Sequence, residues 1–248
     1  LGNLAQNWEK IPDSIGLNVG FVSNIDGYKK AVTVLNNALA TVAANAISSS
    51  FTANVPAGID VVNSLNALKA RYSLFAGDYP AALTAANAVD LTKKSVFSFD
   101  GLSLNPVFET ATSTNNVVQV KDSTLGLPPA LAPNLSDARV PFYTAINPTI
   151  APRFRIKGFF DGATTAIPVY LPGEIQLIKA EVYARQNDST NSKVFLNAVV
   201  TKSTDPFGVA ANLPAIASVN SYANLLDQIY RNRSIELYMS GLRLEDQR

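Results

Sequence analysis

The 248-residue sequence contains no cysteine and no histidine. The missing cysteines exclude disulfides, thiolate metal sites and cysteine nucleophiles, and the missing histidines remove the commonest transition-metal ligand and the commonest general base. Any acid or base would have to come from carboxylates, lysine or tyrosine, and no pair of these has a recognisable catalytic spacing. We therefore predict that the chain is not an enzyme and that it uses no cofactor and no metal.

Charge is also scarce. The chain has 20 basic and 19 acidic residues, a net charge of +1, and only 16% charged residues in total, against roughly a quarter in an average soluble domain. No run of Lys or Arg provides the positive surface that phosphate backbones require, so nucleic acid is not an expected partner. A surface of this kind suits polar, uncharged ligands.

Long apolar runs are absent as well. The longest candidate, Ala38 to Ile47, is interrupted by Asn45 and is far shorter than the roughly 18 residues of a membrane-spanning helix. The hydrophobic content of 47% is nevertheless ample for a large buried core. We expect a globular chain with no span of its own.

Helical periodicity marks the first part of the chain. Apolar residues recur at three- and four-residue steps between Asp26 and Ala46, with Asp26 as a possible N-cap. After a Ser- and Thr-rich loop, residues 62–90 read as two helices around a Gly77-Asp78 turn, with Pro80 in the first turn of the second helix. This predicts a helical hairpin. Its small and aromatic residues have tetratricopeptide spacing at Ala70, Gly77, Tyr79, Ala82 and Ala86.

Residues 95–171 differ in character, because Pro and Gly are frequent and only short apolar runs remain, at Val117–Val120, Val140–Tyr143 and Phe154–Ile156. We interpret them as a loop-rich insert with a few short strands. Helical patterns return at residues 172–186 and again after Ser221, a good N-cap. The prediction is one mainly α-helical domain over residues 1–248, with residues 26–94 and 172–248 as scaffold and 95–171 as insert.

The last twenty residues read IYRNRSIELYMSGLRLEDQR. They resemble the closing signature of the SusD/RagB family, which reads I-x-x-E-R-x-x-E-L-x-x-E-G-x-R-x-x-D-x-x-R. Two acidic positions depart from that pattern, because Asn232 and Ser240 stand there instead. The matching residues are Ile229, Arg233, Glu236, Leu237, Gly241, Arg243, Asp246 and Arg248.

Residues 169–185 also resemble a helix of that family, through Glu174, Ala180, Glu181, Tyr183 and Arg185. Pro172-Gly173 departs from the pattern, which suggests a later start of the helix or a different angle of entry. The resemblance implies a SusD-like fold, with a tetratricopeptide-like scaffold that supports a loop-rich ligand surface. Members are typically longer at both ends, so this chain is expected to be a portion that lacks the lipidated N-terminal Cys and a C-terminal tail.

The resemblance also implies a function. Proteins of this family sit on the cell surface at the outer membrane as lipoproteins, bind an extracellular nutrient, usually a glycan, and cap a SusC-like TonB-dependent transporter that imports it. The expected function is therefore non-catalytic carbohydrate binding for nutrient uptake. The ligand itself is not named by the sequence.

Three aromatic residues are candidates for sugar contacts, because a pyranose presents an apolar face that stacks on aromatic rings. Trp8 is the sole tryptophan, and Phe142 and Tyr143 lie in polar, loop-forming sequence. The alternative interpretation is that these side chains pack in the interior. The signature residues Arg233, Glu236, Gly241, Arg243 and Asp246 are expected to be architectural, with the i,i+3 pairs Arg233–Glu236 and Arg243–Asp246 fixing a helix end and Gly241 as a C-cap or close backbone contact.

Two other classes of function remain open. A helical-repeat adaptor would bind a peptide or protein partner on a concave face. A glycoside hydrolase would need a pair of carboxylates, for which Glu245, Asp246, Asp137 and Asp161 are nominal candidates without a specific spacing. A calcium loop at residues 187–191 lacks the glycine and terminal Glu of the standard motif.

Overall fold

The computed structural model describes residues 1–112, 118–149, 153–219 and 221–247. Most of its ordered structure is helical, and the strands are short, which confirms the predicted mainly α fold. The α-helices are α1 (Gly2–Asn7), α2 (Asn24–Ala44), α3 (Ser49–Asn54), α4 (Val61–Phe75), α5 (Tyr79–Asn87), α6 (Arg139–Tyr143), α7 (Pro172–Arg185), α8 (Ser189–Val200), α9 (Tyr222–Glu236) and α10 (Arg243–Asp246).

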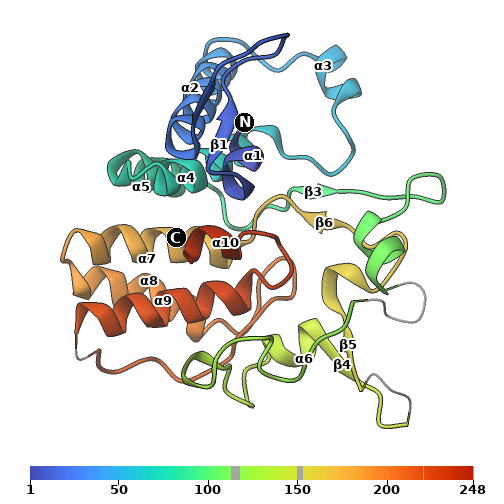
Figure 1. Ribbon diagram of the computed structural model, residues 1–248, viewed down its shortest axis with the longest axis vertical. Helices are drawn as coiled ribbons and strands as arrows, with labels where there is room; N and C mark the ends of the chain where they lie inside the picture. The colour runs from blue at the N-terminus through green and yellow to red at the C-terminus, as the bar shows by residue number, and fades with distance from the viewer. Residues whose placement is uncertain (113–117, 150–152, 220, 248) are drawn as a thin grey trace.

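The strands in the described part of the chain form three separate antiparallel pairs. β1 (Lys10–Pro12) pairs with β2 (Phe21–Ser23), β3 (Val96–Phe97) with β6 (Ile167–Pro168), and β4 (Thr144–Ile146) with β5 (Phe154–Ile156). Figure 1 shows α2 at one end, then α4 and α5, then the layer of α7, α8 and α9, with α6, β4 and β5 of the insert toward the other end. No helix within the described ranges combines the length and apolar character needed to cross a membrane.

The predicted helical hairpin is confirmed as α4 and α5. Gly77 has a φ of 77° in the turn, a conformation that glycine adopts without strain. Asp78 then caps α5, because its carboxylate accepts a hydrogen bond from the backbone N–H of Ala81 at 3.1 Å. Ala70 and Ala82 are both fully buried, as the close approach of two helices requires.

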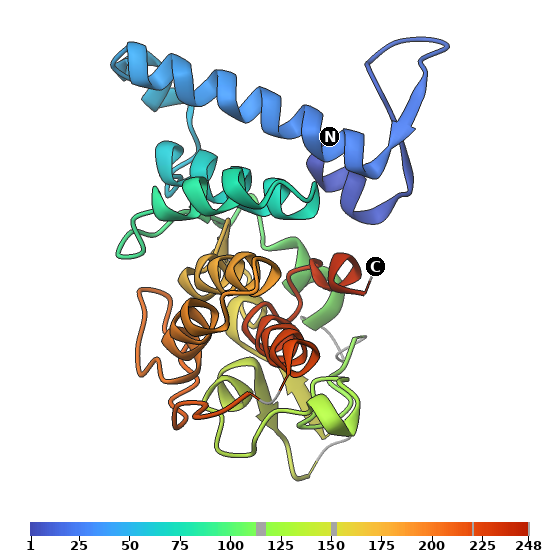
Figure 2. The ribbon, with the colours of Figure 1, turned by 90° about the vertical axis from the view of Figure 1, so that its left-hand side faces the viewer.

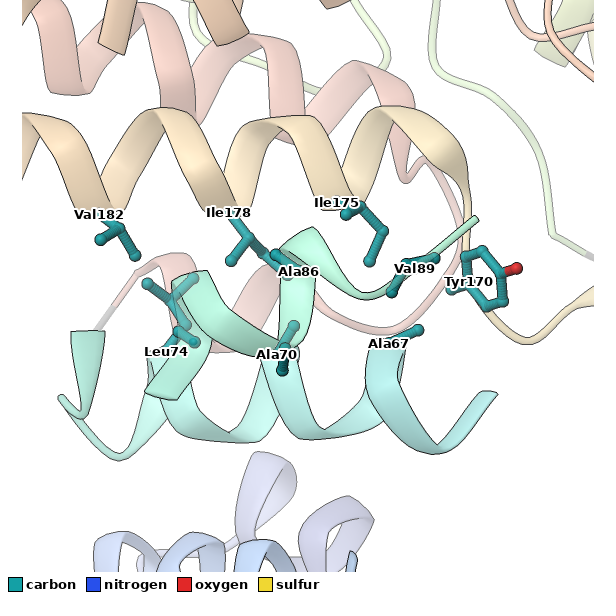
Figure 3. Close-up of a cluster of buried hydrophobic side chains, with 11 residues drawn as sticks. Ala67, Ala70, Leu74, Ala86, Val89, Tyr170, Ile175, Ile178 and Val182 are labelled. Carbon is teal, nitrogen blue, oxygen red and sulfur yellow. The ribbon is translucent and has the colours of Figure 1, made fainter. Parts of the chain in front are cut away.

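The central helix is α7, which is buried on both sides. Figure 3 shows Ile175, Ile178 and Val182 turned toward α4 and α5, where they meet Leu74 and Ala86. The opposite side packs on α8 and α9. This second cluster includes Leu177, Ala180, Ala184, Leu196, Val199, Leu225 and Ile229. α7 is thus covered by apolar clusters on two sides, and its buried carboxylates Glu174 and Glu181 are each paired with an arginine.

Three expectations for the helices need correction. α2 is capped by Ser23 and not by Asp26: the hydroxyl of Ser23 accepts from the N–H of Asp26 and donates to its carboxylate. The expected apolar face of α2 is only half-buried, because only Gly27, Tyr28 and Ala31 are fully buried. α7 begins at Pro172, so its start is not delayed.

The insert was predicted correctly in its character and in part of its detail. The apolar run Phe154–Ile156 is strand β5, paired with β4. Val140–Tyr143 was expected as a strand and is instead the last part of the short helix α6, which directly precedes β4. The start of the run Val117–Val120 lies outside the described residues, and residues 118–120 are not a strand.

Candidate functional site

The carboxylate of Glu236, at the end of α9, lies at the centre of a buried charge network. Arg139 donates from Nη1 to Oε2 at 3.2 Å, and Lys202 donates to Oε1, with neither Arg139 nor Glu236 exposed to solvent. Asp137 holds the other edge of the Arg139 guanidinium at 2.7 Å. Burial alone would lower the pKa of Arg139, but Asp137 and Glu236 outweigh it and raise this pKa above its ordinary value.

A second network centres on Arg233, one turn earlier on α9. Its Nη2 donates to Glu181 of α7 at 2.6 Å, and its Nη1 donates to Asp246 of α10. Burial by itself would raise the pKa of Glu181, but Arg233 and Arg185 lower it below its usual range. For Asp246 burial prevails, so that the pKa of this carboxyl is raised although Arg233 opposes the shift.

These networks correct the prediction that the signature residues pair with one another at i,i+3 spacing. Arg233 and Glu236 do not pair with each other, nor do Arg243 and Asp246; each of the first two instead binds partners on other elements. Arg243 donates to the carbonyl oxygen of Gly126 at 3.4 Å. The signature residues thus hold separate elements together, and no i,i+3 pair fixes the helix end.

Gly241 is neither a helix C-cap nor a close contact. α9 ends at Glu236 with Leu237 as its C-cap residue, and no atom of the described residues lies within 4 Å of the position that a Cβ on Gly241 would occupy. Gly241 has a φ of 80° and Met239 a φ of 64°, so the connection from α9 to α10 turns twice through the left-handed region. A non-glycine residue in that region marks a strained loop, and such loops gather at functional sites.

That connection forms one wall of a cavity of about 410 Å³. A volume of this size falls within the range of small-molecule sites. The other walls come from α1, from the β3–β6 pair, from Arg71 of α4 and from Glu174 in the first turn of α7. The aromatic lining comprises Phe97, Tyr143, Phe159, Phe160, Tyr170 and Tyr238, and the polar lining comprises Asn3, Gln6, Asn7, Arg71, Glu174 and Ser240.

Arg71 and Glu174 form an ion pair in the cavity wall and bind each other. Arg71 donates to both carboxylate oxygens of Glu174, at 2.5 and 2.8 Å, and its Nη2 also donates to the carbonyl oxygen of Val169 at 3.0 Å. Burial would lower the pKa of Arg71, yet Glu174 raises it. A bidentate pair of this kind fixes the shape of the wall, and because the two charges neutralise each other, neither is available to pair with a charged ligand.

Gln6 is different. Its side chain lines the cavity and is 6% exposed, yet its Nε2 has no hydrogen-bond partner among the described residues. A buried amide donor without a partner costs about 1–3 kcal/mol, and a ligand oxygen in the cavity would remove that cost. Asn3, Asn7 and Ser240 are exposed lining residues and therefore mark the mouth of the cavity.

The structure separates the three aromatic residues predicted from sequence. Trp8 is 63% exposed and follows Asn7 directly, outside the cavity lining. Tyr143 is 1% exposed, and its hydroxyl donates to the carbonyl oxygen of Glu236 at 2.6 Å, so it packs in the interior and offers no exposed platform. Phe142 is half-buried and meets the edges of Tyr143 and Phe159.

A larger hollow of about 530 Å³ lies between the start of α2, the α4–α5 turn, α9 and α10. Four of its charged lining residues, Glu181, Arg185, Arg233 and Asp246, bond to one another. None of its lining residues carries an unpartnered buried donor or acceptor among the described residues. The aromatic cavity beside Gln6 is therefore the better candidate for a ligand site.

Acidic side chains give no sign of a metal site in the described ranges, where no group of three or more could hold an ion. Asp188, in the segment considered for calcium, instead caps α8 by accepting a hydrogen bond from the N–H of Asn191 at 3.0 Å. Two of the four carboxylates considered for a glycoside hydrolase, Asp137 and Asp246, each form an ion pair with an arginine.

The sequence matches no protein-family model and no curated protein. Solved structures are similar in fold. A SusD-like carbohydrate binding protein from Bacteroides vulgatus superposes with a TM-score of 0.66 at 19% identity, over 91% of this chain and 52% of that chain. A SusD homologue from Bacteroides ovatus gives 0.69 at 15% identity, over 98% and 65%.

A SusD-like carbohydrate binding protein from Bacteroides fragilis gives a TM-score of 0.67 at 18% identity, over 98% of this chain and 63% of that chain. This chain thus spans between about half and two thirds of the length of these structures. At such identities the similarity establishes a shared fold.

Proposed function

We propose, from the SusD-like fold that this chain has, that it binds an extracellular glycan in the aromatic cavity and does not convert it. The observation that carries the proposal is the amide nitrogen of Gln6, which has no hydrogen-bond partner among the described residues and lines a cavity walled by aromatic rings. Two of the similar structures are described as carbohydrate binding proteins, which supports the ligand class.

The chemistry of the cavity fits one end of a sugar chain. A pyranose ring has an apolar face that packs on aromatic side chains, and its hydroxyl groups both donate and accept hydrogen bonds. Gln6 would donate to a sugar oxygen, while Asn3 and Asn7 lie at the mouth, where further hydroxyls would emerge. Phe97 is the half-exposed ring of the lining and is placed to cover the sugar face.

Binding is expected in the micromolar to millimolar range. Each sugar hydroxyl exchanges a hydrogen bond to water for one to protein, at a net gain of only about 0.5–1.5 kcal/mol. The aromatic contacts add about 0.5–1.5 kcal/mol each beyond their buried area. Loss of a single ring should therefore weaken binding by about tenfold.

The test is calorimetric titration of the chain with a panel of mono- and oligosaccharides, followed by titration of variants with the best ligand. Phe97→Ala and Gln6→Met should each weaken binding by about tenfold. Phe51→Ala is the matched control, because Phe51 is 52% exposed and Phe97 is 49% exposed, and Phe51 lines no cavity described above. Equal affinity of all three variants would reject the site.

Trp8 is proposed as a second, outer contact for a longer glycan, because it is exposed beside Asn7 at the mouth. Its fluorescence is the only tryptophan signal of the chain. An oligosaccharide, but not a monosaccharide, should change that emission, and Trp8→Ala should weaken binding of the oligosaccharide only. Unchanged emission with both ligands would remove Trp8 from the site.

Absence of catalysis is part of the proposal. Incubation of the purified chain with the polysaccharides that it binds should release no reducing sugar above a buffer control. Turnover that is abolished by a single Asp or Glu substitution would instead indicate a glycoside hydrolase. Binding of peptides in preference to sugars would favour the helical-repeat adaptor.

Delivery of the ligand to a SusC-like TonB-dependent transporter, at the outer-membrane surface and with a lipid anchor, is proposed on the resemblance of the closing segment to the SusD/RagB signature. The test is affinity purification of the full-length protein from detergent-solubilised outer membranes, with mass spectrometry of what co-purifies. Co-purification of a TonB-dependent barrel is expected. Recovery of the protein from the soluble fraction without such a barrel would contradict this part of the proposal.

A further inference from the structure

The β1–β2 hairpin is firmly fixed at its base. Ile11 and Val22 face each other across the two strands and belong to the apolar cluster with Tyr28 and Tyr72. Above them the N–H of Asp13 donates to the carbonyl oxygen of Gly20 at 2.9 Å. Lys30 of α2 also donates from Nζ to the carbonyl oxygen of Asp13 at 3.1 Å. The hairpin therefore holds its tip in a set position.

The tip, residues 14–20, projects away from the rest of the chain (Figure 2). Ile15 and Leu17 are fully exposed, and Phe21, where the tip returns to β2, is 68% exposed. Residues 14–21 contain no charged side chain. Gly16 with a φ of 150° and Asn18 with a φ of 56° give the tip its turns.

Such a tip is unusual on a surface that contacts only water. Single exposed apolar side chains are common, but two aliphatic residues fully exposed on one uncharged protrusion, beside an exposed Phe, mark an interaction site. The hairpin does not need them for its own packing, because Ile11 and Val22 already anchor it. Their exposure therefore points to contact with something outside the chain.

The shape of the tip decides what that partner is. A specific protein interface buries about 800 Å² on each side and uses about 20–30 residues with a polar rim. A convex tip with Ile15, Leu17, half-buried Val19 and Phe21 as its apolar side chains is too small and carries no charge that would orient a protein partner. A lipid interface requires neither shape complementarity nor pairing; it requires apolar side chains that can leave water.

We propose that the β1–β2 tip inserts into the interface of a phospholipid bilayer, with Ile15 and Leu17 entering the acyl region and Phe21 at the level of the headgroups. Contact of this size is weak and reversible, comparable to or weaker than a single acyl chain with its binding constant of about 10⁴ M⁻¹. It would orient a protein held at a membrane by other means. The proposal does not depend on glycan binding.

Vesicle flotation tests the proposal. The chain is mixed with an excess of phosphatidylcholine vesicles, and the fraction that floats is measured. The parent chain should float in part, and the double variant Ile15→Asp/Leu17→Asp should float at least about tenfold less, because each buried aliphatic side chain accounts for a factor of ten or more. Leu102→Asp is the matched control, since Leu102 is fully exposed in another loop, and it should float like the parent.

A single-tryptophan variant locates the contact. Leu17→Trp in a Trp8→Phe background places the only tryptophan at the tip. Its emission should shift to the blue with vesicles and should be quenched by brominated lipid. Failure of the parent to float, or no spectral shift at the tip, would overturn the proposal. Loss of a dimer in the double variant, measured by light scattering, would show that a second copy and not lipid covers the tip.

Discussion

Arg139 and Glu236 lie 97 residues apart in the chain and form an ion pair at 3.2 Å. Neither side chain is exposed, and the pair joins α6 of the insert to the end of α9. Two buried charges contribute little to stability while they stay together, but the loss of one leaves the other unpaired in the interior. The pair is therefore a point at which the insert and the helical scaffold depend on each other.

Glu236→Gln should lower the free energy of unfolding by about 3–5 kcal/mol, the usual cost of breaking a buried pair. The uncharged side chain leaves Arg139 and Lys202 without their shared carboxylate. Urea unfolding followed by circular dichroism measures the change. The exposed Glu9→Gln is the control and should stay within about 0.5 kcal/mol of the parent. Equal stability of the two variants would show that the network contributes nothing.

Gly173→Ala should be destabilising by about 1–3 kcal/mol or more. A Cβ on Gly173 would lie 1.8 Å from Oε1 of Glu236, and any shift of that carboxylate would disturb its bonds to Arg139 and Lys202. The sign is informative, because Gly→Ala inside a helix ordinarily stabilises by about 1 kcal/mol. Thermal unfolding measures it. Gly101→Ala serves as control, since within the described ranges no atom lies within 4 Å of its Cβ position. A rise in melting temperature for Gly173→Ala would contradict the packing.

Ala82→Leu should cost about 1–3 kcal/mol, because Ala82 is fully buried where α5 packs on α4 and the larger side chain has no space. Ala40→Leu on α2 is the matched control, because Ala40 is an exposed helical alanine. Urea midpoints of the two variants give the comparison. A midpoint for Ala82→Leu equal to that of the control would mean that α4 and α5 are not in close contact.

We predict that the buried phenol of Tyr170 makes the fold less stable at alkaline pH. Burial, with the negative charges of Asp60 and Asp90, raises the pKa of Tyr170 from 10.0 to about 12. Between these values the unfolded chain has lost the phenol proton and the folded chain still holds it, so stability falls as pH rises through this window. Unfolding free energies at several alkaline pH values should show a shallower fall for Tyr170→Phe. Parallel pH curves for parent and variant would contradict the shift.

The helices of the scaffold were predictable because their signals are local. Asp78 and Ser221 cap the helices that follow them, and Ile175, Ile178 and Val182 recur at helical spacing. α8 was not predicted, because its first turn is polar and gives no apolar periodicity. α1 and α3, each of six residues, are too short for periodicity to reveal.

The candidate site was not predictable in the same way. The partners of Glu236 are Arg139 and Lys202, and the cavity combines Gln6 with Phe97 and Tyr238, residues that only the tertiary fold brings together. Trp8 was selected for its residue type and is exposed. Tyr143 was selected on the same ground, but it is buried and its hydroxyl donates a hydrogen bond to the carbonyl oxygen of Glu236. Residue type alone does not distinguish these two outcomes.

The carboxylate of Glu236 links three segments of the chain. It contacts the insert through Arg139 and the segment after α8 through Lys202, and it fills the space beside Gly173 in the first turn of α7. None of these three segments can open alone without exposing a charge that the other two have buried. Amide protons in α6, in the first turn of α7 and at the end of α9 should therefore exchange with deuterium at a common rate, as one cooperative unit.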